Sequence, residues 1–254
     1  MRTSLPPGRT VSLQDMQMYY VDAGEGEPLL LLHGYTGASS DWAISFDELA
    51  RQYRLIIPDL RGHGRSTNPS GQYTQRQAAR DVWALLDHLG IGSFQAIGAS
   101  GGGNILLHLA TQQPARVEAM VLISAVNSYP EQARQIMRSF SIEQVSAEER
   151  RRLQQRHPQG DAQIQELFRL GRAFAEQDDD MNLTASSLST ITARTLIIFG
   201  DCDPFYPVSI ALDMYRALPH AYLWIVPNGG HVPDLHAPFV PSLLPFLRGE
   251  WERR

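Results

Sequence analysis

The sequence predicts an α/β domain with a mostly parallel sheet and helices on both faces. Short, almost wholly apolar runs such as "LLLL" (Leu29–Leu32) and "TLIIF" (Thr195–Phe199) are typical of strands buried on both faces of a parallel sheet. Longer amphipathic stretches alternate with these runs, as they do in α/β folds. The 254 residues, 43% of them hydrophobic, are enough for one large domain or two small ones.

Each predicted element follows from one of these two patterns. The apolar runs predict strands at Met16–Ala23, Leu29–Leu32, Leu55–Pro58, Phe94–Ile97, Val117–Ser124, Thr195–Phe199 and Leu223–Val226. The amphipathic stretches predict helices at Ser40–Arg51, Gln75–Leu89, Gly101–Gln113, Pro207–Leu218 and Ala237–Leu247. No helix separates the first two strands, so we expect the sheet to begin with an antiparallel strand.

One interval lacks a good strand. Residues 127–192 are rich in Gln, Arg and Glu and carry helical apolar stripes. They predict a helical cap inserted between two core segments, 1–126 and 193–254. The stripes can pack on the core, line a pocket as the underside of a lid, or do both.

Composition excludes several classes of function. The net charge of −5 disfavours a nucleic-acid partner, and no apolar run is long enough to span a bilayer. All 22 basic residues are arginine, so no Schiff-base, pyridoxal-phosphate or P-loop lysine exists in the chain. With one cysteine, no internal disulfide or cysteine-based metal cluster can form. We therefore expect a cytoplasmic protein without metal or cofactor, as a monomer or a homodimer.

The stretch "GASGGG" contains the strongest chemical signal. Gly98, Ser100 and Gly102 fit G-x-S-x-G between a predicted strand and a predicted helix. At such a turn the serine side chain projects from the sheet edge, and bulky neighbours would collide. A plain N-cap serine would not explain the small residue at every flanking position. The pattern therefore predicts that Ser100 is a nucleophile.

A serine nucleophile needs a general base, and histidine is the usual one. His231 lies in "PNGGHVPD", just after the last strand, where two glycines let a loop reach over the sheet edge. We expect His231 to be the base, with His236 as a weaker candidate. His33 and His63 lie in glycine-containing loops. The remaining four histidines lie in or beside helices and are expected on the surface: His88, His108, His157 and His220.

The histidine needs a carboxylate to orient it. "TLIIFGDCDPFYP" offers Asp201 and Asp203, and Asp203 is favoured because it lies further into the loop and precedes Pro204. Asp201 is expected to bind turn amides, and Asp59 to organise the glycine-rich loop that it begins. The order Ser100, Asp203, His231 is the one expected for nucleophile-elbow hydrolases.

An oxyanion intermediate needs preformed hydrogen-bond donors. The backbone N–H of Gly101, directly after the nucleophile, is one candidate. The N–H of Tyr35, in "HGYTG" after a predicted strand, is the other. His33 then has a structural role, which is to hold that loop.

Five motifs resemble the α/β-hydrolase superfamily, in order, over nearly the whole chain: "LLLLHGYTG", "PDLRGHGRS", "AIGASGGG", "IIFGDCDPFYP" and "PNGGHVPDLHAP". The resemblance implies an eight-stranded, mostly parallel sheet, a helical cap after the sixth strand, a Ser-Asp-His triad and an HG-type oxyanion loop. Two positions depart from many relatives. Gly101 replaces a bulky residue, which widens the pocket floor, and His236 replaces a glutamate after the catalytic histidine.

The predicted activity is hydrolysis of carboxylic esters, lactones included, by Ser100, Asp203 and His231. Haloalkane dehalogenases and epoxide hydrolases of this fold use aspartate where this chain has serine. A C–C bond hydrolase or lyase-type relative on the same triad is the alternative, and a ligand sensor without turnover is a third reading. The predicted partner is a small to medium, largely apolar ester. That preference depends on apolar cap residues: Phe140, Leu167, Phe168, Phe174 and Met181.

Overall fold

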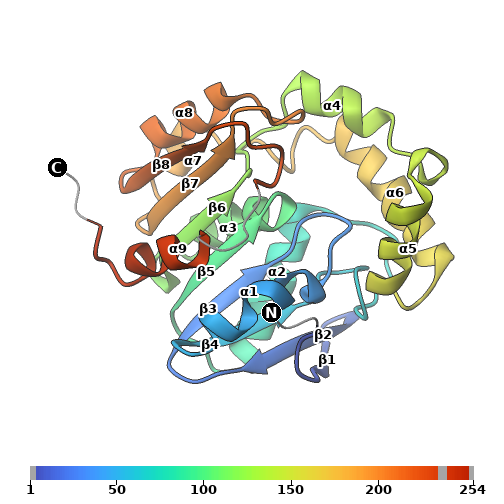
Figure 1. Cartoon of the computed structure of the whole chain (residues 1–254), viewed down its shortest axis with the longest axis horizontal. Coiled ribbons are helices and arrows are strands. Elements are labelled where there is room, and N and C mark those ends of the chain that lie inside the picture. Colours follow the sequence, from blue (N-terminus) through green and yellow to red (C-terminus); the bar gives the residue numbers. More distant parts are fainter. Residues whose placement is uncertain (1–3, 234–238, 252–254) are drawn as a thin grey trace.

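An eight-stranded sheet runs through the protein, as the computed structural model in Figure 1 shows for residues 4–233 and 239–251. The strands are β1 (Arg9–Leu13), β2 (Met16–Ala23), β3 (Glu27–Leu32), β4 (Tyr53–Pro58), β5 (Phe94–Ala99), β6 (Val117–Ile123), β7 (Arg194–Gly200) and β8 (Ala221–Val226). The α-helices are α1 (Ala43–Leu49), α2 (Gln75–His88), α3 (Gly101–Gln112), α4 (Glu131–Arg138), α5 (Ala147–Arg156), α6 (Asp161–Ala173), α7 (Ala185–Leu188), α8 (Val208–Ala217) and α9 (Phe239–Leu247).

The strand order is β1-β2-β4-β3-β5-β6-β7-β8; the pairs β1–β2 and β2–β4 are antiparallel, and the other five pairs are parallel. The predicted fold class and antiparallel start are therefore confirmed. The sequence did not predict β1, because this five-residue edge strand is mostly exposed and lacks an apolar run. β2 pairs with β4 rather than with β3, the next strand along the chain.

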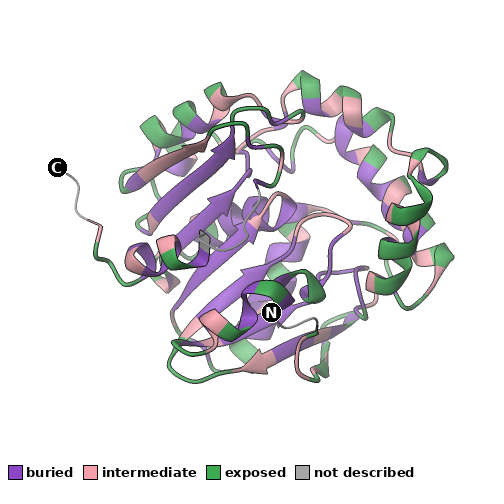
Figure 2. Ribbon diagram, viewed as in Figure 1, coloured by how far each residue is buried: buried purple, intermediate pink, exposed green. Residues whose placement is uncertain are grey.

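Alternate side chains of the buried strands enter two separate cores. Leu29 and Leu31 belong to the core that contains α1 and α9, whereas Leu30 and Leu32 belong to the core that contains α2, α3 and α8. This is the period of two expected of a strand covered on both faces, and Figure 2 shows the central strands buried. The predicted start of the last helix, Ala237, lies outside the described residues. No helix within residues 4–233 or 239–251 has both the length and the apolar content that a bilayer crossing needs.

The segment between β6 and β7 contains helices α4 to α7. Its two ends meet, because the N–H of Leu183 donates to the carbonyl of Asn127 at 2.9 Å and Ser128 bridges to Asn182. Helices α4, α5 and α6 lie together away from the sheet (Figure 1), whereas α7 packs on α3 and α8. The division into core segments 1–126 and 193–254 and a cap at 127–192 stays a prediction.

The turn from β5 into α3 depends on two glycines. A Cβ atom on Gly98 would lie 2.7 Å from the backbone of Gly102. A Cβ atom on Gly102 would lie 2.6 Å from the carbonyl oxygen of His33 and closer still to that of Leu32. Real side chains do not approach backbone atoms so closely, so the helix can start here only without them.

We expect Gly102→Ala to lower the free energy of unfolding by about 1–3 kcal/mol, because the added methyl group must push α3 away from β3. Urea unfolding measures this change. Gly92→Ala is the matched control, since a Cβ atom at Gly92 would meet nothing within 4 Å. Equal stability of the two variants would contradict the close approach.

Candidate active site

Ser100 occupies a strained backbone position between β5 and α3. Its φ of 50° and ψ of −119° are unfavourable for a residue with a side chain. Its N–H donates to the carbonyl of Ile123 on the neighbouring strand at 2.7 Å. The side chain lines a cavity rather than capping the helix. The plain N-cap reading is therefore wrong.

The imidazole of His231 contacts the Ser100 hydroxyl. Nε2 lies 2.9 Å from Ser100 Oγ, and Nδ1 lies 2.9 Å from Oδ2 of Asp203. A neutral ring with its proton on Nδ1 donates to the carboxylate and accepts from the hydroxyl. The loop after β8 thus reaches the end of β5, as the sequence predicts. His236, the weaker candidate, lies outside the described residues.

Asp203 is fixed from several sides. Its side chain is buried, and Oδ1 accepts the N–H groups of Phe205 at 2.7 Å and Tyr206 at 3.2 Å. The rings of Phe205 and Tyr206 also pack against the His231 ring, with centroids 4.6 and 5.1 Å away. Asp201 is exposed, and these two amides donate to Asp203, so the expectation that Asp201 binds the turn amides is not met here.

Two free amides lie near Ser100. Gly101 is in the first turn of α3, where an N–H has no helical acceptor, and Tyr35 follows β3. Within residues 4–233 and 239–251, neither N–H donates a hydrogen bond. A Cβ atom on Gly101 would lie 3.4 Å from the nitrogen of Tyr35, so the two amides flank one small space. An oxyanion needs such a pair of donors.

His33 holds the start of the loop that contains Tyr35. Its Nδ1–H donates to the carbonyl of Gly34 at 2.8 Å, and its Nε2 accepts the N–H of Leu60 at 3.0 Å. Asp59 accepts the N–H groups of Ser39 at 2.7 Å and Arg65 at 2.8 Å. The loop-holding roles predicted for His33 and Asp59 are consistent with these bonds.

Two further histidines hold Thr36, the residue after Tyr35. Thr36 has a φ of 61°, in the left-handed region. His63 Nε2 accepts its N–H at 3.2 Å, and His157 Nε2–H donates to its carbonyl at 2.9 Å. His157 Nδ1 also accepts the N–H of Gly64 at 3.0 Å. Side chains from the core and from the end of α5 therefore fix both polar backbone groups of Thr36.

These three histidines are buried and uncharged. Burial lowers the pKa of His33, of His63 and of His157. His33 and His157 lower the pKa of His63 further, and His33 and Arg156 do the same for His157. The expectation that His108 and His157 lie on the surface is wrong, since both are buried. His108 lies between Leu107 and Leu109 in the buried helix α3, whereas His157 is buried by contacts with the distant residues Thr36 and Gly64.

A cavity of about 720 Å³ opens above Ser100, and its lining is mostly apolar. Of the cap residues predicted to line a pocket, Phe140, Phe168 and Phe174 do so. Leu167 and Met181 are buried in the protein interior and are not among the lining residues. The structure therefore does not place these two residues at the cavity, because other parts of the protein bury them.

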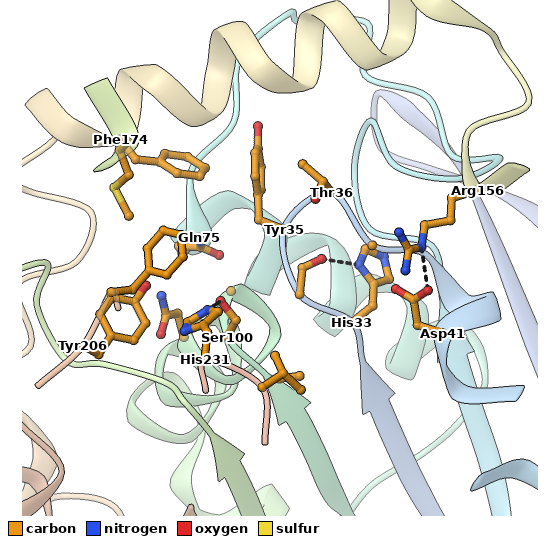
Figure 3. Close-up of a pocket in the computed structure, with 18 of the residues that line it drawn as sticks. His33, Tyr35, Thr36, Asp41, Gln75, Ser100, Arg156, Phe174, Tyr206 and His231 are labelled. Atoms are coloured by element: carbon orange, nitrogen blue, oxygen red, sulfur yellow. Dashed lines mark hydrogen bonds and ion pairs between the residues drawn. The ribbon is translucent and has the colours of Figure 1, made fainter. Parts of the chain in front are cut away.

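Polar groups at the cavity wall were not predicted. Figure 3 shows Asp41 and Arg156 at one end, away from Ser100 and His231. Arg156 Nε donates to Asp41 Oδ1 at 2.7 Å, which joins α5 to the core. Gln75 and Asn104 line the wall near Ser100. No local sequence pattern marks these four residues, because packing between separate segments brings them to the cavity.

Comparison with known proteins agrees with this architecture. A family model described as alpha/beta hydrolase fold matches residues 27–142. A soluble epoxide hydrolase from Corynebacterium is 36% identical over 110 residues, which is 43% of this chain and 38% of that protein. A 2-hydroxymuconate semialdehyde hydrolase from Pseudomonas putida is 28% identical over 88% of this chain and 87% of its own. The chain thus spans well under half the length of the first relative and most of the second.

Solved structures extend the match to nearly every residue. A meta-cleavage product hydrolase from Pseudomonas fluorescens has a TM-score of 0.77 and 22% identity, and covers 96% of this chain and 98% of its own. A thermophilic esterase from Thermogutta terrifontis has a TM-score of 0.75 and 22% identity, and covers 96% and 99%. The sheet order, the family model over residues 27–142 and these matches together show that the chain has the α/β-hydrolase fold.

Proposed function

We propose that the chain is a serine hydrolase that cleaves carboxylic esters, lactones included, through an acyl-enzyme. The observation that carries this proposal is the hydrogen-bonded series of Ser100, His231 and Asp203, with 2.9 Å at each of its two junctions. The series opens onto a cavity with a mostly apolar lining. A hydroxyl, a base and an orienting carboxylate in this arrangement are the requirements for nucleophilic acyl transfer.

Acylation begins when Ser100 Oγ attacks the ester carbonyl and His231 Nε2 takes its proton. Asp203 accepts the hydrogen bond from His231 Nδ1–H, which holds the ring in place, and stabilises the imidazolium ion that forms. The carbonyl oxygen becomes an oxyanion between the N–H groups of Gly101 and Tyr35. Collapse of this intermediate breaks the bond to the alcohol, which receives its proton from His231. A water molecule then repeats the sequence on the acyl-enzyme and releases the acid.

The uncharged histidines support this role for Tyr35. A protonated His63 would point an N–H at the N–H of Thr36, and the hydrogen bond between them would be lost. The same applies to His157 and Gly64. The neutral rings therefore keep the loop, and with it the Tyr35 amide, in one conformation before substrate binds.

The cavity supports a small to medium substrate with a largely apolar body. Its volume of about 720 Å³ is within the range of small-molecule sites. Phe140, Phe168, Phe174 and Phe205 supply aromatic surface to it.

Hydrolysis of a carbon–carbon bond is the second candidate. Of the two relatives described above, the one aligned over the larger share of both chains is a 2-hydroxymuconate semialdehyde hydrolase. Epoxide hydrolysis is disfavoured despite the other relative, since Ser100 stands where that branch uses aspartate.

Ser100→Ala and His231→Ala should each lower kcat for an ester by about 10⁴-fold or more, because each removes a group that acts in the transition state. Asp203→Asn should cost somewhat less. Steady-state hydrolysis of p-nitrophenyl butyrate measures these losses. Retention of activity in His231→Ala would contradict its role as base.

A substrate panel separates the candidate functions. We expect sustained turnover of p-nitrophenyl esters, fastest for acyl chains long enough to contact the phenylalanines that line the cavity, and slower cleavage of 2-hydroxymuconate semialdehyde. Higher kcat/KM for the latter would favour the carbon–carbon hydrolase. A single burst of nitrophenol without steady turnover would instead indicate a ligand sensor.

Stability should fall as the pH falls below about 6.5, the ordinary pKa of histidine. Below this pH the histidines bind protons in the unfolded chain but stay neutral in the folded protein, because burial lowers their pKa values. Each can cost up to about 1.4 kcal/mol per pH unit in this window, and nothing above it. Urea unfolding at about pH 7.5 and about pH 5.5 measures the loss.

The matched variants are His157→Gln and His88→Gln. His157 is buried, so its replacement should flatten the pH dependence, whereas His88 is exposed and its replacement should not. An unchanged slope in His157→Gln would contradict the neutral, hydrogen-bonded state of that ring.

A further inference from the structure

The side chain of Tyr35 is bound to helix α6, which also supplies Phe168 to the cavity wall. Its hydroxyl donates to the carbonyl of Leu167, in the middle of α6, at 2.7 Å. Burial raises the pKa of this phenol well above its ordinary value, so the hydroxyl stays protonated and can donate. Figure 3 shows the Tyr35 side chain pointing away from Ser100, toward the helix at the top of the view.

Gly171 makes room for the Tyr35 ring on α6. Glycine is unfavourable inside a helix, so its presence there indicates that a side chain would not fit. A Cβ atom at this position would lie 2.7 Å from Tyr35 Cε1 and 3.0 Å from the ring of Phe140. The Tyr35 ring therefore lies closer to the backbone of α6 than a side chain at residue 171 would allow.

Three further aromatic rings surround the Tyr35 ring. Phe174, directly after α6, has its ring centroid 4.8 Å away. The rings of His63 and Tyr73, which belong to the core, lie at 5.0 and 5.5 Å. All three pairs have the edge-to-face arrangement that aromatic rings favour. The Tyr35 ring is thus packed between α6 and the core, so a shift of α6 would move it.

Other hydrogen bonds connect α5 and α6 to the same region. Gln163 Nε2, near the start of α6, donates to the carbonyls of Gly62 and Gly64 at 2.9 Å each. His157, directly after α5, donates to the carbonyl of Thr36. The segment between β6 and β7 therefore holds the side chain of residue 35 and the carbonyl of residue 36. Both lie next to the amide that is proposed to bind the oxyanion.

We propose that the side chain of Tyr35 is a positioning group for its own N–H, so that the oxyanion site is complete only while α6 is bound to the core. This inference rests on the proposed ester hydrolysis, in which that N–H binds the oxyanion. Both amides must lie within hydrogen-bond distance of one oxygen, and a displaced donor stabilises it less. Loss of the bond to α6 is then a loss of transition-state stabilisation, and substrate binding changes little.

The test is Tyr35→Phe, which removes the hydroxyl and keeps the amide. The variant should fold, because the carbonyl of Leu167 keeps its helical hydrogen bond from the N–H of Gly171. We expect kcat for p-nitrophenyl butyrate to fall about tenfold and KM to change by less than about twofold. Rates are expressed per active site titrated with a fluorophosphonate, so a smaller fraction of folded protein does not contribute.

Tyr73→Phe is the matched control. Tyr73 is also buried, and its ring packs against Tyr35. The substitution removes a phenol hydroxyl from the same group of rings and leaves the bond between Tyr35 and Leu167 in place. It should therefore keep the wild-type kcat.

A pair of inhibitors separates an effect on the oxyanion from damage to the cavity. Ser100 Oγ adds to the carbonyl carbon of 1,1,1-trifluoro-2-octanone, its proton passes to His231, and the carbonyl oxygen becomes an oxyanion. 1,1,1-Trifluoro-2-octanol has the same chain and cannot form this adduct. In Tyr35→Phe the inhibition constant of the ketone should rise about tenfold, and that of the alcohol should change by less than about twofold.

Gly171→Ala tests the inference from α6, with Tyr35 unchanged. Its methyl group would overlap the Tyr35 ring, so we expect a lower kcat and weaker inhibition by the ketone. Alanine is the better helix former, so a gain in helix stability would not explain a loss of activity. If this variant does not fold, Tyr35→Phe decides alone.

Four outcomes would overturn the inference. They are a wild-type kcat in Tyr35→Phe, an equal rise of both inhibition constants in that variant, an equal loss of kcat in Tyr73→Phe, and unchanged inhibition by the ketone in a folded Gly171→Ala. A wild-type protein that neither hydrolyses the ester nor binds the ketone more tightly than the alcohol would instead contradict the proposed function itself. The two failures are therefore distinguishable.

Discussion

The close approach of α3 to the end of β3 is the constraint on which the site depends. Gly102 lies against the carbonyl groups of Leu32 and His33, where no side chain fits. Because α3 lies so close to the end of β3, the chain must turn sharply between β5 and α3, and Ser100 takes a positive φ to make this turn. The same contact brings the loop that continues from β3 beside Gly101. One packing requirement thus sets both the direction of the hydroxyl and the spacing of the two amides.

Histidine serves two opposite purposes in this protein. His231 is partly exposed and lies between a carboxylate and the Ser100 hydroxyl, where the proposed mechanism uses it as the base. His33, His63 and His157 are enclosed and serve as fixed pairs of one donor and one acceptor. A carboxylate could only accept in those places, and a lysine could only donate. A neutral imidazole satisfies an N–H and a carbonyl at once and remains uncharged.

Features that depend on short motifs directly after a strand could be predicted from the sequence. Ser100, Asp203 and His231 each follow a strand of the parallel sheet, and such strands end at one edge, so their meeting could be predicted. β1 could not, because an edge strand such as Arg9–Leu13 gains its pairing from β2 and not from an apolar pattern. The burial of His157 depends on how the helices between β6 and β7 lie on the rest of the protein. No short-range pattern encodes that placement.

The ends of the inserted segment meet at Asn127 and Leu183, and a short linker could therefore close the chain across them. The shortened chain would keep all eight strands of the sheet and the hydrogen-bonded residues Ser100, His231 and Asp203. It would also lose His157, and the carbonyl of Thr36 and the amide of Gly64 would be left to solvent. If this segment is exchanged for the corresponding segment of another protein with this fold, matching the shape of the pocket is not sufficient. The new segment must also present a hydrogen-bond donor to the carbonyl of residue 36 and an acceptor to the N–H of residue 64.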